Sequence, residues 1–85
     1  MTDAEILAGV LDTLASIAPE VPGDQLAVDQ PLRAQVDLDS MDWLNFLIGL
    51  HQRFGVDIPE TDYAQLIHLR AIVDYLAARR PPATG

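Results

Sequence analysis

The sequence predicts an all-α fold, a four-helix bundle with three main helices, one short helix and a long first loop. Three segments repeat apolar residues every three or four positions, which is the spacing of an amphipathic helix, and no segment alternates apolar and polar residues as a half-buried strand does. A chain of 85 residues has room for one hydrophobic core. We therefore expect residues 1–85 to form a single domain, with residues 1–2 and 81–85 frayed.

The first helix is expected over residues 3–18. Thr2 and Glu5 match the Thr-x-x-Glu capping box, in which each side chain binds a backbone N–H of the first turn. Pro19 ends the helix because it lacks the N–H that the next turn requires. The apolar face consists of Ile6, Leu7, Val10, Leu11, Leu14 and Ile17.

The segment 19–39 contains three prolines and no helical period, so we expect a loop there. A connection of about 20 residues is unusually long for a compact domain. Apolar residues recur through the segment, and we expect them to anchor it to the core as an ordered strap. They are Leu26, Val28, Leu32, Val36 and Leu38.

The second main helix is expected over residues 40–54. Asp39 has the side chain of an N-cap, and Asp42 lies in the first turn, where a carboxylate interacts favourably with the helix dipole. Gly55 is the residue type that ends helices in the left-handed conformation.

The last third of the chain predicts an extended connector over 56–59, a short helix over 60–66 and a final helix over 69–79. Arg79 and Arg80 are favourable at the negative end of that helix, and Pro81 and Pro82 stop it. Its core face is formed by Leu69, Ile72, Val73 and Leu76.

The chain is acidic: thirteen Asp and Glu residues oppose five Arg residues, there is no Lys, and the formal net charge is −8. This balance argues against nucleic-acid binding, which depends on cations at the phosphates, and favours basic protein partners. There is no Cys, which excludes disulfides and thiolate metal sites. No apolar run reaches the roughly 18 residues of a membrane span, and the first residues are acidic, so we expect a cytoplasmic protein without membrane insertion.

The second main helix has more apolar surface than one core contact needs. Its core stripe is expected to contain Trp43, Phe46, Leu47, Leu50 and Phe54. Met41, Leu44 and Ile48 widen the apolar arc to roughly 220°, about twice the usual width. Either the long loop and the short helix cover this flank, or Met41 and Ile48 stay partly exposed beside Asn45 and Gln52, bordered by Asp42, as a docking strip.

Ser40 lies in the first turn of the same helix, and its residue type allows two interpretations. A serine there is most often a helix cap. A hydroxyl at a helix amino terminus is also a favourable place for a phosphate ester, because the free N–H groups and the dipole stabilise an anion.

Three stretches, in this order, resemble the acyl carrier proteins: 37–44 (DLDSMDWL), 54–59 (FGVDIP) and 72–76 (IVDYL). The resemblance covers most of the chain. It implies that Ser40 is esterified with 4′-phosphopantetheine, which a magnesium-dependent phosphopantetheinyl transferase donates from coenzyme A. The thiol of the arm then holds acyl groups as thioesters, and the carrier itself is not an enzyme, with no catalytic residue and no metal site.

The resemblance also assigns partner-recognition residues. Asp39, Met41 and Asp42 match the family's contact with the transferase, and Leu44, Asn45 and Ile48 match its enzyme-docking helix. It implies acyl ligases, transferases or synthases with basic docking surfaces as partners, and we expect a monomer that visits them in turn.

This chain departs from fatty-acid carriers at Asn45 and over 51–53 (HQR), where acidic residues are usual, and Asp37 and Leu38 replace the usual Gly-Ala. We therefore expect a specialised fatty acid, lipid or polyketide-type pathway. The same helix is also consistent with a different class of protein, an unmodified acidic adaptor that binds a basic partner through this helix. An adaptor does not need the Ser40 hydroxyl.

Other sites fit the residues poorly. Asp37, Asp39 and Asp42 lack the Gly at the sixth position of a calcium loop. Ser40 and His51 could belong to a hydrolase triad, but the chain has no Gly-x-Ser-x-Gly elbow. His51 and His68 are expected to be structural or surface residues, because two histidines at this spacing lack further metal partners.

Overall fold

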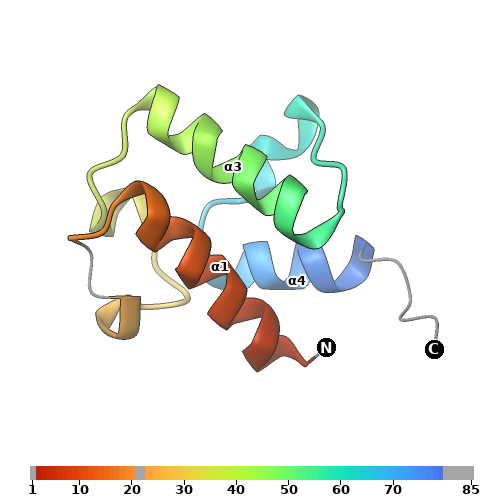
Figure 1. Cartoon of the computed structure of the whole chain (residues 1–85), viewed down its shortest axis with the longest axis horizontal. Coiled ribbons are helices and arrows are strands. Elements are labelled where there is room, and N and C mark those ends of the chain that lie inside the picture. Colours follow the sequence, from red (N-terminus) through yellow and green to blue (C-terminus); the bar gives the residue numbers. More distant parts are fainter. Residues whose placement is uncertain (1, 21–22, 80–85) are drawn as a thin grey trace.

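The computed structural model describes residues 2–20 and 23–79, and within these ranges the chain is all-α without a strand, as predicted (Figure 1). The elements are α1 (Asp3–Ile17), η1 (Gly23–Gln25), α2 (Leu32–Gln35), α3 (Ser40–Phe54), η2 (Glu60–Gln65) and α4 (Leu69–Arg79), where η marks a 3₁₀ helix. No helix in this part of the chain is both long and apolar enough to cross a membrane.

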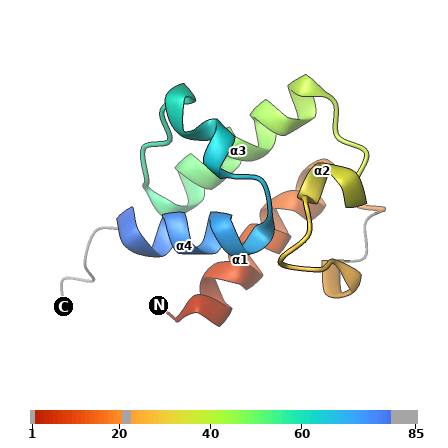
Figure 2. The same cartoon turned by 180° about the vertical axis from the view of Figure 1, so that it is seen from behind.

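The three main helices form the core, and α1 packs against both α3 and α4 (Figures 1 and 2). Each contributes the face that the sequence periodicity predicts. The side chains that are almost completely buried, at 1% exposed or less, include Ile6, Val10 and Leu14 of α1, Phe46, Leu47 and Leu50 of α3, and Leu69, Ile72 and Leu76 of α4. Burial of this apolar surface is the main force that holds the helices together.

The start of α1 confirms the predicted capping box. Thr2 Oγ1 accepts a hydrogen bond from Glu5 N at 3.2 Å, and Glu5 Oε1 accepts one from Thr2 N at 2.9 Å. The helix ends at Ile17, one residue earlier than expected, with Ala18 as its C-cap. Thr2, which we expected at a frayed end, is thus part of the cap, while residues 1 and 81–85 lie outside the described residues.

Two glycines allow α1 and α3 to approach each other closely. A Cβ atom at Gly9 would lie 2.7 Å from Phe54 Cζ, and one at Gly49 would lie 2.8 Å from Thr13 Cγ2. Both distances are shorter than a carbon–carbon contact allows. The close crossing of the two helices therefore requires glycine at both positions. Sequence periodicity does not reveal this requirement.

The segment 19–39 corrects one prediction, because it contains the short helical turns η1 and α2 where no helix was expected. A single turn is too short to show a helical period in sequence. The predicted strap is otherwise confirmed: Leu32, Val36 and Leu38 are buried, and Leu26 and Val28 pack partly buried against the core.

Hydrogen bonds fix the strap to the start of α4. Leu32 N donates to Ile67 O at 2.8 Å, and Arg70 N donates to Val28 O at 2.8 Å. Within the strap, the Gln35 side chain accepts from Ala27 N at 2.7 Å and donates to Ala27 O at 2.9 Å. Two separate parts of the loop are thereby held against the start of α4.

The predicted short helix over 60–66 is confirmed as the 3₁₀ helix η2, and α4 has the predicted bounds and core face. Arg80, Pro81 and Pro82 lie outside the described residues. His68 has a structural role, as expected, since its Nδ1 accepts a hydrogen bond from Ala71 N at 3.1 Å. An imidazole thus acts at the start of α4 in the way that Ser or Asp caps other helices.

Tyr75 joins α4 to η2. Its hydroxyl donates to Asp62 Oδ2 at 2.6 Å, and the Arg79 guanidinium lies 3.9 Å from the centre of its ring. Burial, and then the hydrogen bond to the Asp62 carboxylate, raise the pKa of Tyr75 from 10.0 to about 12.

This pKa shift predicts a loss of stability at high pH. Because the folded-state pKa of Tyr75 lies above the unfolded value, its contribution is complete below pH 10.0 and disappears as the pH rises to about 12. We expect the free energy of unfolding to fall over this interval, and to fall less in Tyr75→Phe, which has no proton to lose. Urea unfolding followed by circular dichroism across the interval measures both slopes, and parallel slopes would contradict the assignment.

Candidate functional site

The start of α3 is capped by Asp39, as predicted. Asp39 Oδ1 accepts a hydrogen bond from Asp42 N at 2.8 Å, and Asp39 O accepts one from Trp43 N at 2.9 Å. Ser40 is the first residue of the helix, and its side chain is exposed. Among the described residues the Ser40 hydroxyl has no hydrogen-bond partner. Because Asp39 provides the cap, Ser40 is not needed for it.

The electrostatic surroundings of Ser40 are mixed. The amino terminus of α3 carries the positive end of the helix dipole, which favours an anion. Asp39 is exposed and Asp42 is partly buried, and both bring negative charge to the same turn.

At the other end of α3, Gly55 has φ 66°, the left-handed conformation expected of the residue that stops this helix.

Three apolar side chains of α3 are exposed: Met41 at 74%, Leu44 at 44% and Ile48 at 43%. Of the two interpretations of the wide apolar arc, the structure supports the exposed one, because the strap and η2 do not cover these residues. Asn45 and Gln52 are also exposed. We call Met41, Leu44, Asn45 and Ile48 the α3 strip.

Trp43 differs from the sequence expectation. It was predicted in the core stripe with Phe46, but it is only partly buried, with its ring 5.6 Å from the Phe46 ring at an angle of 41°. It lies at the edge of the core, where one part of the indole packs inward and the rest is accessible.

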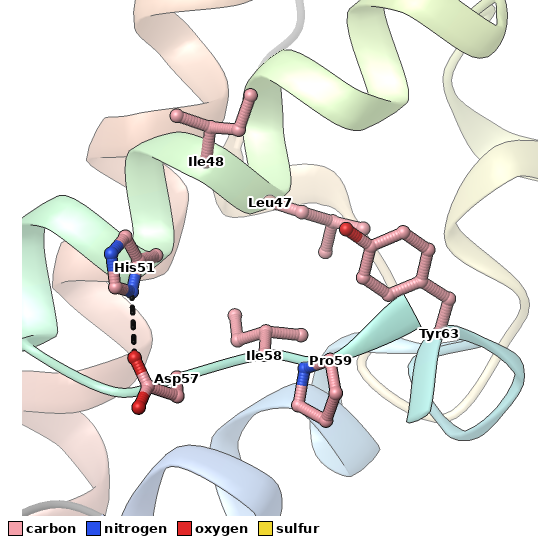
Figure 3. Close-up of a pocket in the computed structure, with 7 residues that line it drawn as sticks. All are labelled: Leu47, Ile48, His51, Asp57, Ile58, Pro59 and Tyr63. Atoms are coloured by element: carbon pink, nitrogen blue, oxygen red, sulfur yellow. Dashed lines mark ion pairs between the residues drawn. The ribbon is translucent and has the colours of Figure 1, made fainter. Parts of the chain in front are cut away.

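A groove of about 360 Å³ continues from the α3 strip toward η2 (Figure 3). Ile48 belongs to both features. His51 and Asp57 lie together at one end of the groove, and the His51 Nδ1 atom is 2.9 Å from Val56 O and 3.7 Å from Asp57 Oδ1. The lining residues are Leu47, Ile48, His51, Asp57, Ile58, Pro59 and Tyr63.

The sequence did not predict this groove. Ile58 and Pro59 belong to the connector, whose path determines whether they cover α3 or leave a gap beside it. The one sequence signal for the groove was that Ile58 and Pro59 are apolar residues in a segment without helical period. The position of the connector relative to α3 is a tertiary property, and it decides where the gap lies.

The arrangement is not that of a hydrolase triad. Ser40 and His51 lie eleven residues apart on α3, which separates them by about 16 Å along the helix axis at 1.5 Å per residue. A catalytic pair has to be within hydrogen-bond reach. In the described part of the chain there is also no group of three or more His, Asp or Glu side chains placed to hold a metal ion.

Comparisons with known proteins give one consistent result. A family model described as a phosphopantetheine attachment site matches residues 5–76. A protein named acyl carrier protein from Campylobacter hominis is 28% identical over 61 residues, which is 72% of this chain and 72% of that protein. Proteins of the same name from Acidothermus cellulolyticus and Thermobifida fusca are 25% and 24% identical, over 91% and 88% of this chain and 90% and 94% of their own lengths.

Proposed function

Because the chain belongs to the phosphopantetheine attachment site family of acyl carrier proteins, we propose that it carries acyl intermediates as thioesters on an arm esterified to Ser40. The cofactor of this family is 4′-phosphopantetheine. The observation that supports Ser40 as the anchor is its exposed hydroxyl, which has no partner among the described residues, at the start of α3.

The two serines of the chain differ in availability. The Ser16 hydroxyl donates to Thr13 O at 2.6 Å and is engaged within α1. The Ser40 hydroxyl is available to a modifying enzyme. The dipole and the backbone N–H groups of the first turn of α3 favour an attached phosphate, and Asp39 holds the backbone there.

Once attached, the arm supplies a terminal thiol that holds an acyl group as a thioester. The chain anchors the arm at Ser40 Oγ and presents it beside the α3 strip. Asp39 and Asp42 attract basic surfaces of partner enzymes and steer their approach. A tethered acyl group is then supplied to the bound enzyme at high effective concentration. We propose no catalytic residue in the carrier, which is a substrate of other enzymes.

We propose the α3 strip and the adjoining groove as the partner surface for the phosphopantetheinyl transferase and for acyl ligases, transferases or synthases. Exposed apolar residues rimmed by polar ones are typical of transient interfaces. Asn45, His51 and Arg53, all exposed, make this helix less negative than the net charge suggests. That difference supports a dedicated partner in a specialised fatty acid, lipid or polyketide-type pathway.

Intact-mass spectrometry tests the function directly. After incubation with coenzyme A, Mg²⁺ and a broad-specificity phosphopantetheinyl transferase, we expect one added phosphopantetheinyl group, and fragmentation should locate it on Ser40. A chain that stays unmodified, or carries the group at Ser16, would contradict the proposal.

Partner docking is expected to depend on Met41 and Ile48. A carboxylate at either position places charge in the centre of the proposed interface, and we expect Met41→Asp and Ile48→Asp to weaken transferase binding by about tenfold or more, or 1.4 kcal/mol. Met41→Asp should change stability by only about 0.5 kcal/mol, because Met41 is an exposed first-turn residue. Surface plasmon resonance with the apo chain measures binding, and thermal unfolding measures stability.

The matched control is Ala15→Asp, which introduces the same charge at an exposed position of α1. Equal loss of binding in this variant would show that charge alone, and not the α3 strip, is responsible. Unchanged binding in both α3 variants would exclude the strip as the docking surface.

A further inference from the structure

A second groove lies between α3, α2 and the link that joins η2 to α4, and it includes Trp43, three residues after Ser40. Its volume is about 200 Å³, and it is lined by Pro31, Arg33, Trp43, Tyr63, Leu66 and Ile67. Figure 2 shows these three parts of the chain, with α2 below the first turns of α3. The hydrogen bond from Leu32 N to Ile67 O, at 2.8 Å, joins two sides of the groove and fixes its width.

Arg33 brings a positive charge to the immediate surroundings of Ser40. Its Nη2 atom donates to Leu38 O at 3.1 Å, and its guanidinium lies 5.8 Å from the centre of the Trp43 ring. Leu38 precedes Ser40 by two residues. Trp43 follows it by three, and residues so spaced on a helix have Cβ atoms about 5–6 Å apart on the same face. The guanidinium is therefore held by groups that belong to residues two before and three after Ser40.

The charge of Arg33 is opposite to that of the two residues that flank Ser40. Asp39 and Asp42 flank Ser40 and repel a phosphate placed there. Arg53, by contrast, is paired with Asp12 at 2.7 Å. Arg33 has no carboxylate partner among the described residues. A guanidinium suits a phosphate because its planar fork of donors can bind two oxygens at once.

The rest of the groove is apolar and partly open. Ile67 is 55% exposed and Trp43 is only partly buried. Leu66 is 1% exposed and forms the base of the groove. A phosphopantetheine arm continues from its phosphodiester into a gem-dimethyl carbon and then into amides. The groove thus offers a cation for the phosphodiester and apolar side chains for the gem-dimethyl segment.

We propose that this groove binds the phosphate-proximal half of the chain's own prosthetic arm, an inference that rests on the proposed function. Arg33 pairs with the phosphodiester on Ser40, and Trp43 and Ile67 pack against the gem-dimethyl segment. Arg33 is a positioning residue: it offsets the repulsion from Asp39 and Asp42 and holds the arm against the protein between visits to enzymes. The groove is distinct from the one in Figure 3, although Tyr63 lines both.

Trp43 is the single tryptophan of the chain and therefore reports on this groove without a label. The experiment measures acrylamide quenching of its fluorescence in the apo chain and in the holo chain, with the holo state verified by intact mass. We expect a smaller quenching constant in the holo chain, because the arm shields the indole. Acrylamide is neutral, so the comparison can be repeated at about 1 M salt, where the Debye length falls to about 3 Å and the protection should shrink.

Three variants separate the contribution of Arg33 from a general effect of charge. The difference between apo and holo quenching should disappear in Arg33→Gln, persist in Arg33→Lys, and persist in Arg53→Gln, which removes a charge about 20 Å further along α3. Because apo and holo forms of the same variant are compared, any direct effect of Arg33 on the fluorescence of Trp43 cancels. Circular dichroism confirms that each variant is folded.

Two outcomes overturn the inference alone: equal quenching of apo and mass-verified holo wild type, or full protection in holo Arg33→Gln. Both leave the carrier function intact, because the arm is attached in either case. A wild-type chain that acquires no arm contradicts the proposed function itself, and the mass spectrum distinguishes that result from the other two.

Discussion

Replacing Ser40 with alanine is expected to abolish phosphopantetheinylation completely while the fold is retained. The reaction requires an oxygen nucleophile at this position, and alanine has none. Stability should change by about 0.5 kcal/mol or less, as for other exposed positions, because the α3 cap is provided by Asp39 Oδ1, 2.8 Å from Asp42 N. Intact-mass spectrometry measures the modification, and thermal unfolding measures the stability of the same sample.

Ser16→Ala is the matched control. It removes the other serine hydroxyl, and with it the 2.6 Å hydrogen bond to Thr13 O, but should leave the modification unchanged. If Ser40→Ala still gained the group, the anchor would be elsewhere. If Ser40→Ala kept full biological activity, the chain would act as an unmodified adaptor instead.

Phe46→Ala is expected to give the largest loss of stability. Phe46 is completely buried at the centre of α3 and packs against Trp43, so its truncation removes apolar burial and leaves a cavity. Such changes cost about 3–5 kcal/mol. A domain of this size is stable by roughly 4–13 kcal/mol, at 0.05–0.15 kcal/mol per residue. The variant should therefore be close to unfolding, as urea titration followed by circular dichroism would show.

Leu44→Ala provides the comparison on the same helix, two residues earlier. Leu44 is 44% exposed and belongs to the α3 strip, so we expect a loss of only about 1 kcal/mol. A loss as large as that of Phe46→Ala would show that Leu44 is part of the core. That result would remove the strip as a docking surface.

The positions of the main helices were readable from the sequence because their signals are local. The Thr2–Glu5 capping box, the Asp39 cap and Gly55 act within one turn, and the apolar period of each helix extends over several turns. These signals gave α1 to within one residue and gave α3 and α4 with their observed bounds. They did not reveal η1 and α2, which are too short to show a period.

Ser40 could be selected from the sequence because its position in the helix and its resemblance to a known motif are both features of one short stretch. The side chains that surround Ser40 in space could not be predicted from the sequence. The sequence placed Trp43 in the core, whereas the path of α2 puts it at the edge beside Arg33. Arg33 itself gave no sequence signal, since its contact with Leu38 O depends on how the strap folds back.

Residue types alone establish which segments form helices and which face of each helix is apolar, since capping and periodicity depend on residues within a few turns of one another. The tertiary structure alone decided how much of the apolar arc of α3 is covered and where the two grooves lie. Coverage depends on the routes of the strap and of η2, and those routes are fixed by contacts between residues far apart in the chain, such as Leu32 with Ile67 and Asp62 with Tyr75.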